Sequence, residues 1–246
     1  MLKGKRVIVT GGGSNFGKAL SIWLARERAE VILCGRNITQ AQATADIIRQ
    51  EGGIAEAYEC DIADMLSIQQ FAQHVTLNPK PIDVLILNAA QWLDGDLNNG
   101  ATDEQIVSTI NSGLTGSILL TKALLPHMNR DQGSDIIGMI SVCGVPNFTD
   151  SIAHPAFFAA KQGLGGFCHT ISQSLATENI RVTALYPPDF QTLDINADIS
   201  HHNRSGERLL TGQSVWQTIK FILAQPRSCH ISAIHFQGPS REQLAQ

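Results

Sequence analysis

Short apolar runs alternate along this chain with longer stretches whose apolar residues recur at helical spacing. The runs are rich in β-branched residues and predict strands at residues 7–9, 31–34, 54–60, 82–87, 135–140, 181–186 and 230–236. The stretches predict helices from about residue 16 and at about 39–50, 64–76, 103–129, 155–177 and 213–224. Such alternation with short connections is typical of a parallel sheet covered on both faces. We expect one α/β domain over residues 1–246, three-layered, with a doubly wound, seven-stranded parallel sheet.

Two stretches depart from this regular pattern. Residues 191–211 are polar, carry His201 and His202 and show no clear strand, so they form either a mobile lid over a pocket or an ordinary surface loop. Gly163, Gly165 and Gly166 lie inside a predicted helix. Glycine is costly there, so we expect another backbone to approach closely.

A glycine cluster joins the first predicted strand to the first predicted helix. Gly11, Gly12 and Gly13 follow the strand, and Gly17 lies within the start of the helix. This arrangement sets free backbone N–H groups and a helix N-terminus against a phosphate. The spacing G-x-G-x-x-G is not met, because the residue three after Gly13 is Phe16. A turn that needs small residues only for packing is the alternative.

Composition and charge limit the kinds of molecule that this protein is expected to bind. The chain is 43% hydrophobic and 16% charged, with a formal net charge of -4 and no run of lysine or arginine. These values fit a globular protein with a sizeable core and argue against binding to nucleic acid or to a membrane surface. No apolar stretch approaches the ~20 residues of a membrane span. The basic start, Lys3 to Arg6, does not resemble a secretory signal.

Cysteine and histidine show no metal-binding spacing. The five cysteines form no C-x-x-C pair; they are Cys34, Cys60, Cys143, Cys168 and Cys229. An odd number without such spacing predicts reduced, mostly buried thiols in a cytoplasmic protein, with neither a disulfide framework nor a zinc site. We expect no bound metal.

The glycine segment resembles the T-G-x-x-x-G-x-G loop of the short-chain dehydrogenase/reductase family. It reads Thr10 to Gly17, with Asn15 in place of the middle glycine. Asparagine is the residue other than glycine that best tolerates a left-handed backbone. The resemblance implies a single-domain Rossmann-type fold and a nucleotide held by Gly11, Gly13, Ser14, Asn15, Phe16 and Gly17.

Further motifs of that family follow in the same order, between the expected strands. Asp61 and Ile62 resemble the contact to the adenine ring, and Asn88, Ala89 and Ala90 resemble the N-A-G element. Pro187 and Thr192 resemble the P-G-x-x-x-T segment that holds the nicotinamide carboxamide, although Pro188 replaces its glycine. The resemblance extends from Arg6 to about Phe236 and implies an NAD(P)-dependent oxidoreductase.

The residue after the second predicted strand bears on the choice of nucleotide. Folds that select NAD place an acidic residue there, whereas this chain reads Cys34-Gly35-Arg36-Asn37. A guanidinium pairs well with the oxygens of a 2′-phosphate. We therefore favour NADP(H) over NAD(H); the alternative is that Arg36 is simply solvated.

The catalytic residues implied by the resemblance are incomplete. Ser141 matches the serine that binds the substrate oxygen, Asn111 the asparagine that holds a helix kink and a relay water, and Lys161 the lysine of Y-x-x-x-K. Phe157 stands where that motif has its tyrosine. A phenylalanine keeps the ring and loses the proton donor. The protein is then a pseudo-reductase, an engineered trap, or an enzyme in which another group has taken over the proton.

Two residues are candidates for that replacement. His154 lies thirteen residues after Ser141, near the usual spacing of the tyrosine, and residues 147–152 could form a loop that carries it over the substrate. Tyr186 ends the sixth predicted strand, at the edge where such sheets hold ligands. The alternatives are a surface histidine and a packed tyrosine.

The leading hypothesis is an NADP(H)-dependent oxidoreductase that transfers hydride between nicotinamide and a carbonyl or alcohol carbon. Trp92, Cys143 and residues 191–211 would border an apolar pocket for a small-molecule substrate. A cofactor-binding protein without turnover and a lyase or isomerase that uses the same pocket remain open. The two long predicted helices are those that family members pack against each other, which implies a homodimer or homotetramer.

Overall fold

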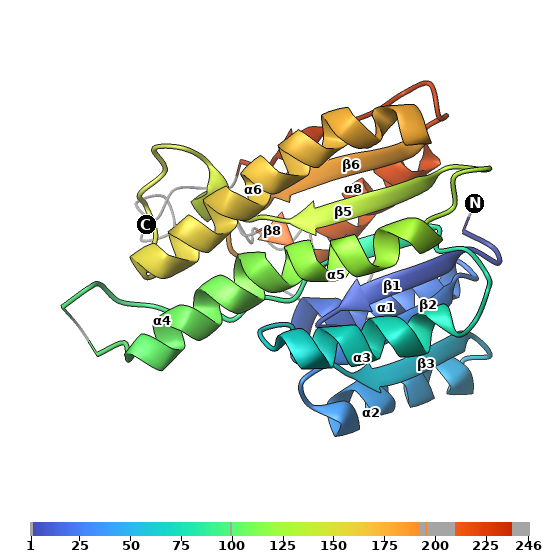
Figure 1. The fold of residues 1–246 in the computed structure, drawn as a ribbon, viewed down its shortest axis with the longest axis horizontal. Helices are drawn as coiled ribbons and strands as arrows, with labels where there is room; N and C mark the ends of the chain where they lie inside the picture. Colours follow the sequence, from blue (N-terminus) through green and yellow to red (C-terminus); the bar gives the residue numbers. More distant parts are fainter. Residues whose placement is uncertain (1, 99, 192–194, 196–209, 238–246) are drawn as a thin grey trace, which may run out of the picture.

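The computed structural model describes residues 2–98, 100–191, 195 and 210–237. Its centre is a seven-stranded sheet in the order β3-β2-β1-β4-β5-β6-β9, in which every neighbouring pair is parallel (Figure 1). The strands are β1 (Arg6–Thr10), β2 (Glu30–Gly35), β3 (Ile54–Glu59), β4 (Val84–Leu87), β5 (Ser134–Met139), β6 (Ile180–Tyr186) and β9 (Ala233–His235). The predicted doubly wound α/β fold with a seven-stranded parallel sheet is confirmed.

Helices cover both faces of this sheet because its strands are apolar on both sides. Val7 and Val9 of β1 pack into one buried cluster with α1 (Asn15–Arg26), α2 (Ile38–Gln50) and α8 (Gly212–Ala224). Ile8, between them, packs into a second cluster with α3 (Met65–Thr76), α5 (Gly116–Leu124) and α6 (Pro155–Leu175). Alternate side chains of a strand point to opposite faces, so the inner strands β1, β2, β4, β5 and β6 contribute to both clusters.

The strand order creates a crevice between β1 and β4. The chain runs outward from β1 to β3 and then returns to β4 on the other side of β1. Open sheets of this kind bind ligands at the carboxyl ends of the strands, where the order reverses. In Figure 1 these ends point toward the side where α4 (Asp103–Ile110) and the first turns of α6 extend past the sheet.

The helix predicted at 103–129 is interrupted. A π-helical turn, Asn111–Thr115, separates α4 from α5, and the chain ends the helix in a short 3₁₀ turn, Leu125–His127. The Gly116 N–H bonds to the Asn111 carbonyl. A Cβ on Gly116 would lie 1.7 Å from the Ile62 carbonyl oxygen, so the helix passes very close to the loop after β3. Hydrophobic periodicity did not predict this turn, whereas the family resemblance implied a kink at Asn111.

The expectation of a close backbone at the α6 glycines is wrong. A Cβ on Gly163 would meet the Leu114 side chain at 2.6 Å, and one on Gly165 would meet the Tyr186 hydroxyl at 2.8 Å. Gly166 has nothing within 4 Å. Two of these glycines therefore make room for side chains, and the third is exposed.

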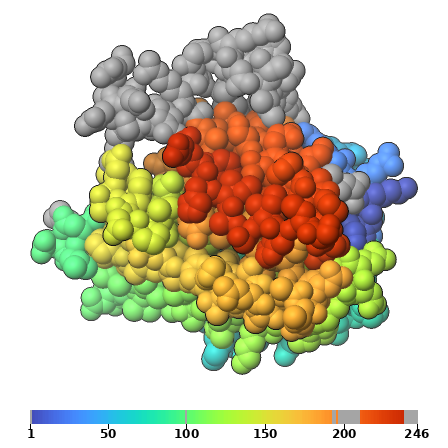
Figure 2. All heavy atoms as spheres, turned by 90° about the horizontal axis from the view of Figure 1, so that it is seen from above, coloured from blue at the N-terminus to red at the C-terminus, as the bar shows by residue number. Residues whose placement is uncertain are grey.

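The ends of the predicted lid segment are ordered as strands, which the sequence did not suggest. β7 (Phe190–Gln191) pairs in parallel with β8 (Leu210–Thr211). Residues 192–194 and 196–209, with Thr192, His201 and His202, lie outside the described residues, so the lid stays a prediction. Strand β9 is also shorter than the run 230–236. Seen from above in Figure 2, the residues from α8 onward, in orange and red, occupy the centre of this face of the molecule.

All five cysteines are free, and four of them are buried. Among the described residues, no helix is long and apolar enough to cross a membrane. Within the same residues, no group of three or more histidine, cysteine, aspartate or glutamate side chains is placed to hold a metal ion.

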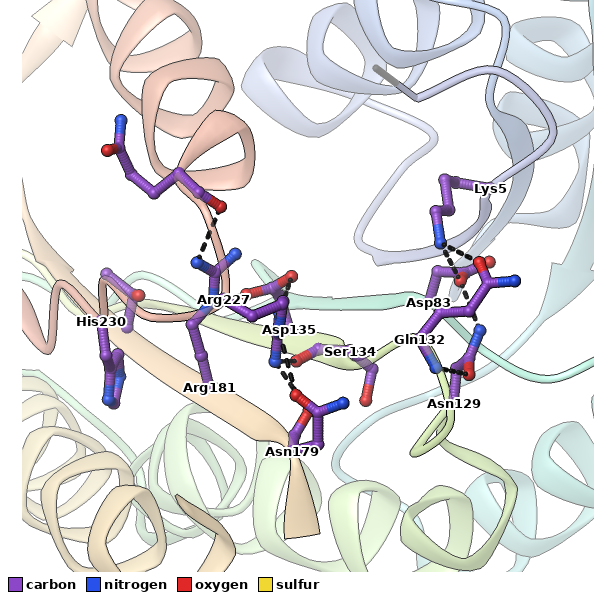
Figure 3. Close-up of polar contacts among 12 residues, drawn as sticks. Lys5, Asp83, Asn129, Gln132, Ser134, Asp135, Asn179, Arg181, Arg227 and His230 are labelled. Atoms are coloured by element: carbon purple, nitrogen blue, oxygen red, sulfur yellow. Dashed lines mark hydrogen bonds and ion pairs between the residues drawn. The ribbon is translucent and has the colours of Figure 1, made fainter. Parts of the chain in front are cut away.

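A buried ion cluster fastens the opposite, amino-terminal edge of the sheet. Asp135, in β5, accepts from Arg181 Nε at 2.7 Å and from Arg227 Nη1 at 3.1 Å (Figure 3). The Arg181 guanidinium also donates to the carbonyl oxygens of Gln225, Pro226 and Cys229. The cluster thus ties the segment after α8 to β5 and β6, which holds β9 in register. It lies away from the strand ends that form the crevice.

Replacing Asp135 by asparagine should destabilise the fold by about 3 kcal/mol, because it leaves the buried Arg181 and the half-buried Arg227 without their carboxylate. The Asp135 and Arg181 side chains are only 11% and 8% exposed. The matched control is Glu51→Gln, which breaks an exposed ion pair with Arg26 and should cost about 1 kcal/mol or less. Urea unfolding measures both; equal losses in the two variants would contradict the assignment.

Candidate active site

The largest group of predicted binding residues surrounds one cavity of about 360 Å³ at the carboxyl ends of β1, β2 and β4. Every predicted nucleotide contact before α3, together with the three that follow β4, lines it: Gly11, Gly13, Ser14, Asn15, Phe16, Gly17, Arg36, Asp61, Ile62, Asn88, Ala89 and Ala90. Sequence reasoning missed other lining residues, among them Cys34, Asn37, Gln40, Cys60, Gln91 and Ser112. The one feature of the sequence that could have indicated these residues is their position, since several lie at or after the end of a predicted strand.

The glycine loop is shaped by its own close contacts. A Cβ on Gly17 would lie 2.0 Å from the Gly11 carbonyl oxygen, and one on Gly13 would lie 2.9 Å from the Ala41 nitrogen. Asn15 has φ 45°, so the left-handed backbone predicted for it is present. The loop therefore places the start of α1 directly against β1 and α2.

The N-terminus of α1 is built to accept an anion. Its N-cap residue, Ser14, makes no side-chain capping bond, and its first turn contains no acidic residue. The first N–H groups of a helix have no partner within the helix and carry partial positive charge. Ser14, Asn15, Phe16 and Gly17 all line the cavity, so these donors face its space.

Asn88 connects the loop to β4. Its side-chain amide donates to the Thr10 carbonyl at 3.0 Å, while the backbone N–H groups of Asn88 and Ala89 both donate to Thr10 Oγ1 at 2.9 Å. On the other side of β1, the Gly12 N–H donates to the Cys34 carbonyl at 3.0 Å. These bonds fix both walls of the crevice before any ligand is present.

Arg36 lies exposed at the β2 wall of the cavity. Its Nη1 reaches Gln91 Oε1 at 3.4 Å, a weak contact that leaves most of the guanidinium available. Asp61 is the one carboxylate among the described residues that line this cavity, and its Oδ1 accepts from the Ala63 N–H at 2.9 Å. The wall beside Arg36 is therefore basic and polar.

A second cavity of about 380 Å³ adjoins the first, and the two share Phe16 and Asn88. Its lining is mostly aromatic and apolar and brings together Ser141, Phe157, Lys161 and Pro187 with Trp92, Met139, Ile140, Pro188, Asp189 and Phe190. The expected contribution of Trp92 is thus present. Cys143 does not line this cavity and instead packs with Phe157 in a small buried cluster.

Ser141 sits in a strained backbone conformation at the end of β5, with φ 94°. Its Oγ accepts from the Cys143 N–H at 3.3 Å, so the hydroxyl proton is free to point elsewhere. Non-glycine residues at positive φ are uncommon and persist where the surroundings hold them. Here a 3₁₀ turn, Val142–Gly144, packs tightly against α6: a Cβ on Gly144 would lie 3.0 Å from the Lys161 carbonyl.

Lys161 and Phe157 lie one helical turn apart on the cavity side of α6. Lys161 Nζ donates to the Met139 carbonyl at 2.8 Å and lies 5.5 Å from the centre of the Phe157 ring. Burial lowers the pKa of Lys161 to about 8. The Phe157 ring meets Trp92 edge to face at 4.9 Å. A cation, an aromatic wall and the Ser141 hydroxyl therefore surround one space.

Three predicted catalytic residues are placed outside both cavities. His154 caps α6 and is buried, Tyr186 stacks on His235 at 4.3 Å, and Asn111 begins the π turn. The loop expected to carry His154 over the substrate instead positions it at the helix start, with its N–H bonded to the Leu93 carbonyl. Asn111 occupies the predicted irregularity in the helix.

The sequence profile of the short chain dehydrogenase family matches residues 5–204. The chain belongs to the short-chain dehydrogenase/reductase family. This short-chain dehydrogenase accordingly has the Rossmann-type fold of its family, in keeping with its seven-stranded parallel sheet. A metagenomic short-chain oxidoreductase, solved in complex with NADP, superposes on 98% of the chain and 99% of its own length, with a TM-score of 0.79 and 24% identity.

Relatives differ in how much of their length this short-chain dehydrogenase spans. A fatty acyl-CoA reductase of Acinetobacter baylyi is 28% identical over 192 residues, which is 78% of this chain and 64% of the relative. An uncharacterized oxidoreductase of Bacillus subtilis is 30% identical over 76% of this chain and 64% of its own. The chain thus covers less than two thirds of both. An uncharacterized oxidoreductase of Staphylococcus aureus is 26% identical over 95% of this chain and 97% of its own.

Proposed function

We propose that this protein binds NADP(H) and transfers hydride between the nicotinamide and a carbonyl or alcohol carbon, with a proton step weakened by Phe157. One observation carries the proposal. The cavity lined by the glycine loop and the cavity lined by Ser141 and Lys161 meet at Phe16 and Asn88. A dinucleotide lying across both would extend from Arg36 to Lys161.

The residues of both cavities fit such a nucleotide. The uncapped start of α1 suits a pyrophosphate, and Arg36 with Asn37 suits a 2′-phosphate at the β2 wall. Lys161 and Pro187 would hold the nicotinamide end. When bound, the nucleotide supplies or accepts the hydride.

The protein's own residues provide orientation and charge. Because Ser141 Oγ already accepts a bond from Cys143, its proton is available to a substrate oxygen. Lys161 places positive charge beside that oxygen in a space with aromatic walls, where electrostatic interactions are stronger than in water. The Phe157 ring shapes the space and cannot exchange a proton.

A panel of ketones and aldehydes tests the proposal through the loss of NADPH absorbance. We expect turnover that is slow but dependent on Ser141, so that Ser141→Ala abolishes it while NADPH binding persists. No turnover on any carbonyl, in the native chain and in the Phe157→Tyr variant alike, would contradict a reductase.

Phe157 favours a second candidate, a cofactor-binding protein without turnover. Phe157 is only 7% exposed and packs against Trp92 and Cys143, so its ring is well packed without a hydroxyl group. Tight NADPH binding without activity, and without gain of activity in Phe157→Tyr, would identify this function.

Arg36→Ala should weaken NADPH binding about tenfold or more and leave NADH binding nearly unchanged, because only NADPH carries the 2′-phosphate; the loss of one charge-assisted pair is worth roughly 1.5–3 kcal/mol. Lys122→Ala, which removes an exposed cation of α5, is the control and should affect neither nucleotide. Fluorescence titration measures the dissociation constants. A parallel loss for both nucleotides would contradict recognition of the 2′-phosphate.

A further inference from the structure

The reaction cavity contains few groups that could exchange a proton. Among the described residues that line it, only Lys161 and Asp189 have ionisable side chains. Asp189 is exposed to solvent, whereas Lys161 is buried and lines the cavity together with Ser141. If hydride transfer occurs here, as the proposed function requires, the proton must come from Lys161, from water or from outside the cavity lining.

The geometry of His154 excludes it as that acid. Its Nδ1 accepts from the Ala156 N–H at 3.1 Å, so this nitrogen carries no proton. The neutral ring then holds its one proton on Nε2, which is buried with no partner in the described structure. A second proton on Nδ1 would face the Ala156 N–H and break the bond that caps α6. The residue serves as the N-cap of α6 and does not line the cavity.

Tyr186 is also unsuited. Its ring stacks on His235 with an interplanar angle of 8°, its hydroxyl lies beside Gly165, and the residue does not line the cavity. Burial raises the pKa of the Tyr186 phenol, which makes it a weaker acid. Neither predicted replacement is therefore placed to act.

Lys161 meets each requirement that these two fail. It lines the cavity together with Ser141, and its single hydrogen bond, to the Met139 carbonyl, leaves two N–H groups. Three titratable groups face it: Cys143 from the 3₁₀ turn, Cys168 from α6 and Asp189 across the cavity. Burial raises the pKa of Cys168 to about 12, so that thiol stays neutral. Burial also brings the pKa of Lys161 to about 8, which suits proton exchange.

We propose that Lys161 itself is the acid and base of this site, exchanging a proton directly with the substrate oxygen in place of the phenol that Phe157 lacks. In reduction, the carbonyl carbon receives a hydride, with two electrons, from the bound dihydronicotinamide. The carbonyl oxygen takes a proton from the Lys161 ammonium, which becomes a neutral amine. Water then returns a proton to Lys161, and the products are the alcohol and the oxidised nucleotide.

The dependence on pH has a defined sign. Reduction needs the ammonium form, so its rate should fall about tenfold per pH unit above about 8, whereas oxidation needs the neutral amine and should rise with pH up to about 8 and then level off. Single-turnover NADPH oxidation between about pH 6 and about pH 10 measures this. The profile requires no mutation. In the protein without nucleotide, the ¹³Cε resonance of Lys161 should titrate near pH 8, well below exposed lysines.

A substitution that keeps the positive charge distinguishes the role of Lys161 as a proton donor from its role as a cation. Arginine is always charged and cannot release a proton, so Lys161→Arg should lower reduction about 10²-fold in the native chain. In the Phe157→Tyr variant the same substitution should cost much less, because the phenol supplies the proton. NADPH dissociation constants and melting temperatures are measured for the native chain, Lys161→Arg, Phe157→Tyr and the double variant. They show whether arginine at position 161 preserves the fold and nucleotide binding.

The outcomes separate this inference from the function on which it rests. Equal losses from Lys161→Arg in both backgrounds, or a reduction rate unchanged from pH 7 to about 10, would overturn Lys161 as the acid while leaving a reductase. Turnover that appears only in Phe157→Tyr would also overturn it and identify a disabled reductase. Absence of NADPH binding would overturn the proposed function and the inference together.

Discussion

Phe157→Tyr should raise the rate of carbonyl reduction about 10²-fold, the lower end of what a positioned acid contributes, because Lys161 already supplies part of the step. The variant ring would occupy a place already built for it, at the wall of the cavity and 5.5 Å from Lys161 Nζ. A nearby ammonium lowers the pKa of a phenol, so the new hydroxyl would be the better acid. Steady-state kcat with NADPH and an active carbonyl substrate measures the gain.

The neighbouring residue provides a matched control for this variant. Phe158 belongs to the same apolar cluster but does not line the cavity. Phe158→Tyr adds the same atom to the same helix and should leave kcat unchanged. A gain in both variants would show that the effect comes from altered packing. Unchanged activity in Phe157→Tyr, with native NADPH affinity and melting temperature, would contradict the assignment of this position.

Periodicity predicts most of the fold because burial imposes it. The inner strands of the sheet are apolar on both faces, as Val7, Ile8 and Val9 show, and such runs stand out from the amphipathic helices. Capping residues then fix helix starts: Asn37, Asp64 and Thr102 each bond to an N–H of the first turn. These are local signals, so the sequence contains them in full.

The features that the sequence does not reveal depend on contacts between distant residues. The resemblance implied a kink at Asn111, but its form as a π turn arises where Gly116 meets the Ile62 carbonyl, and the β7-β8 pair joins residues on either side of the predicted lid. The same holds for His154: spacing along the chain suggested an acid, and only the bond from the Ala156 N–H shows which nitrogen lacks a proton. Motif spacing places a residue on a helix, but it does not show in which direction the hydrogen-bond donors of its side chain point.

The family motifs predict the residues of the nucleotide cavity more completely than they predict the catalytic residues. The glycine loop, Asp61 and Asn88 follow strand ends, and parallel strands end at one edge of a sheet, so their convergence is geometrically required. Ser141 and Lys161 meet because one turn of α6 packs against the end of β5. Nothing in the motif predicts that this space has aromatic walls or that Asp189 lies at its margin.

Gly17→Ala should cost about 1–3 kcal/mol of stability through overpacking and weaken nucleotide binding by roughly 10- to 100-fold if that cost falls on the bound form. The added Cβ would lie 2.0 Å from the Gly11 carbonyl oxygen and 2.7 Å from the Asn88 amide nitrogen. The first of these is backbone and cannot rotate away, so α1 must shift from β1. That shift would move the donors at the start of α1 away from the cavity they line.

Gly166→Ala is the control that separates this contact from a general effect of replacing glycine in a helix. Gly166 is exposed in α6, with nothing within 4 Å of an added Cβ, so the same change should stabilise the protein by about 0.5–1 kcal/mol. If close packing of the loop determines binding, urea unfolding should show a loss of stability in Gly17→Ala and a gain in Gly166→Ala. NADPH titration should show weaker binding in Gly17→Ala and native affinity in Gly166→Ala. Native NADPH affinity in Gly17→Ala would show that the loop tolerates displacement, and the start of α1 would then not be where the anion is held.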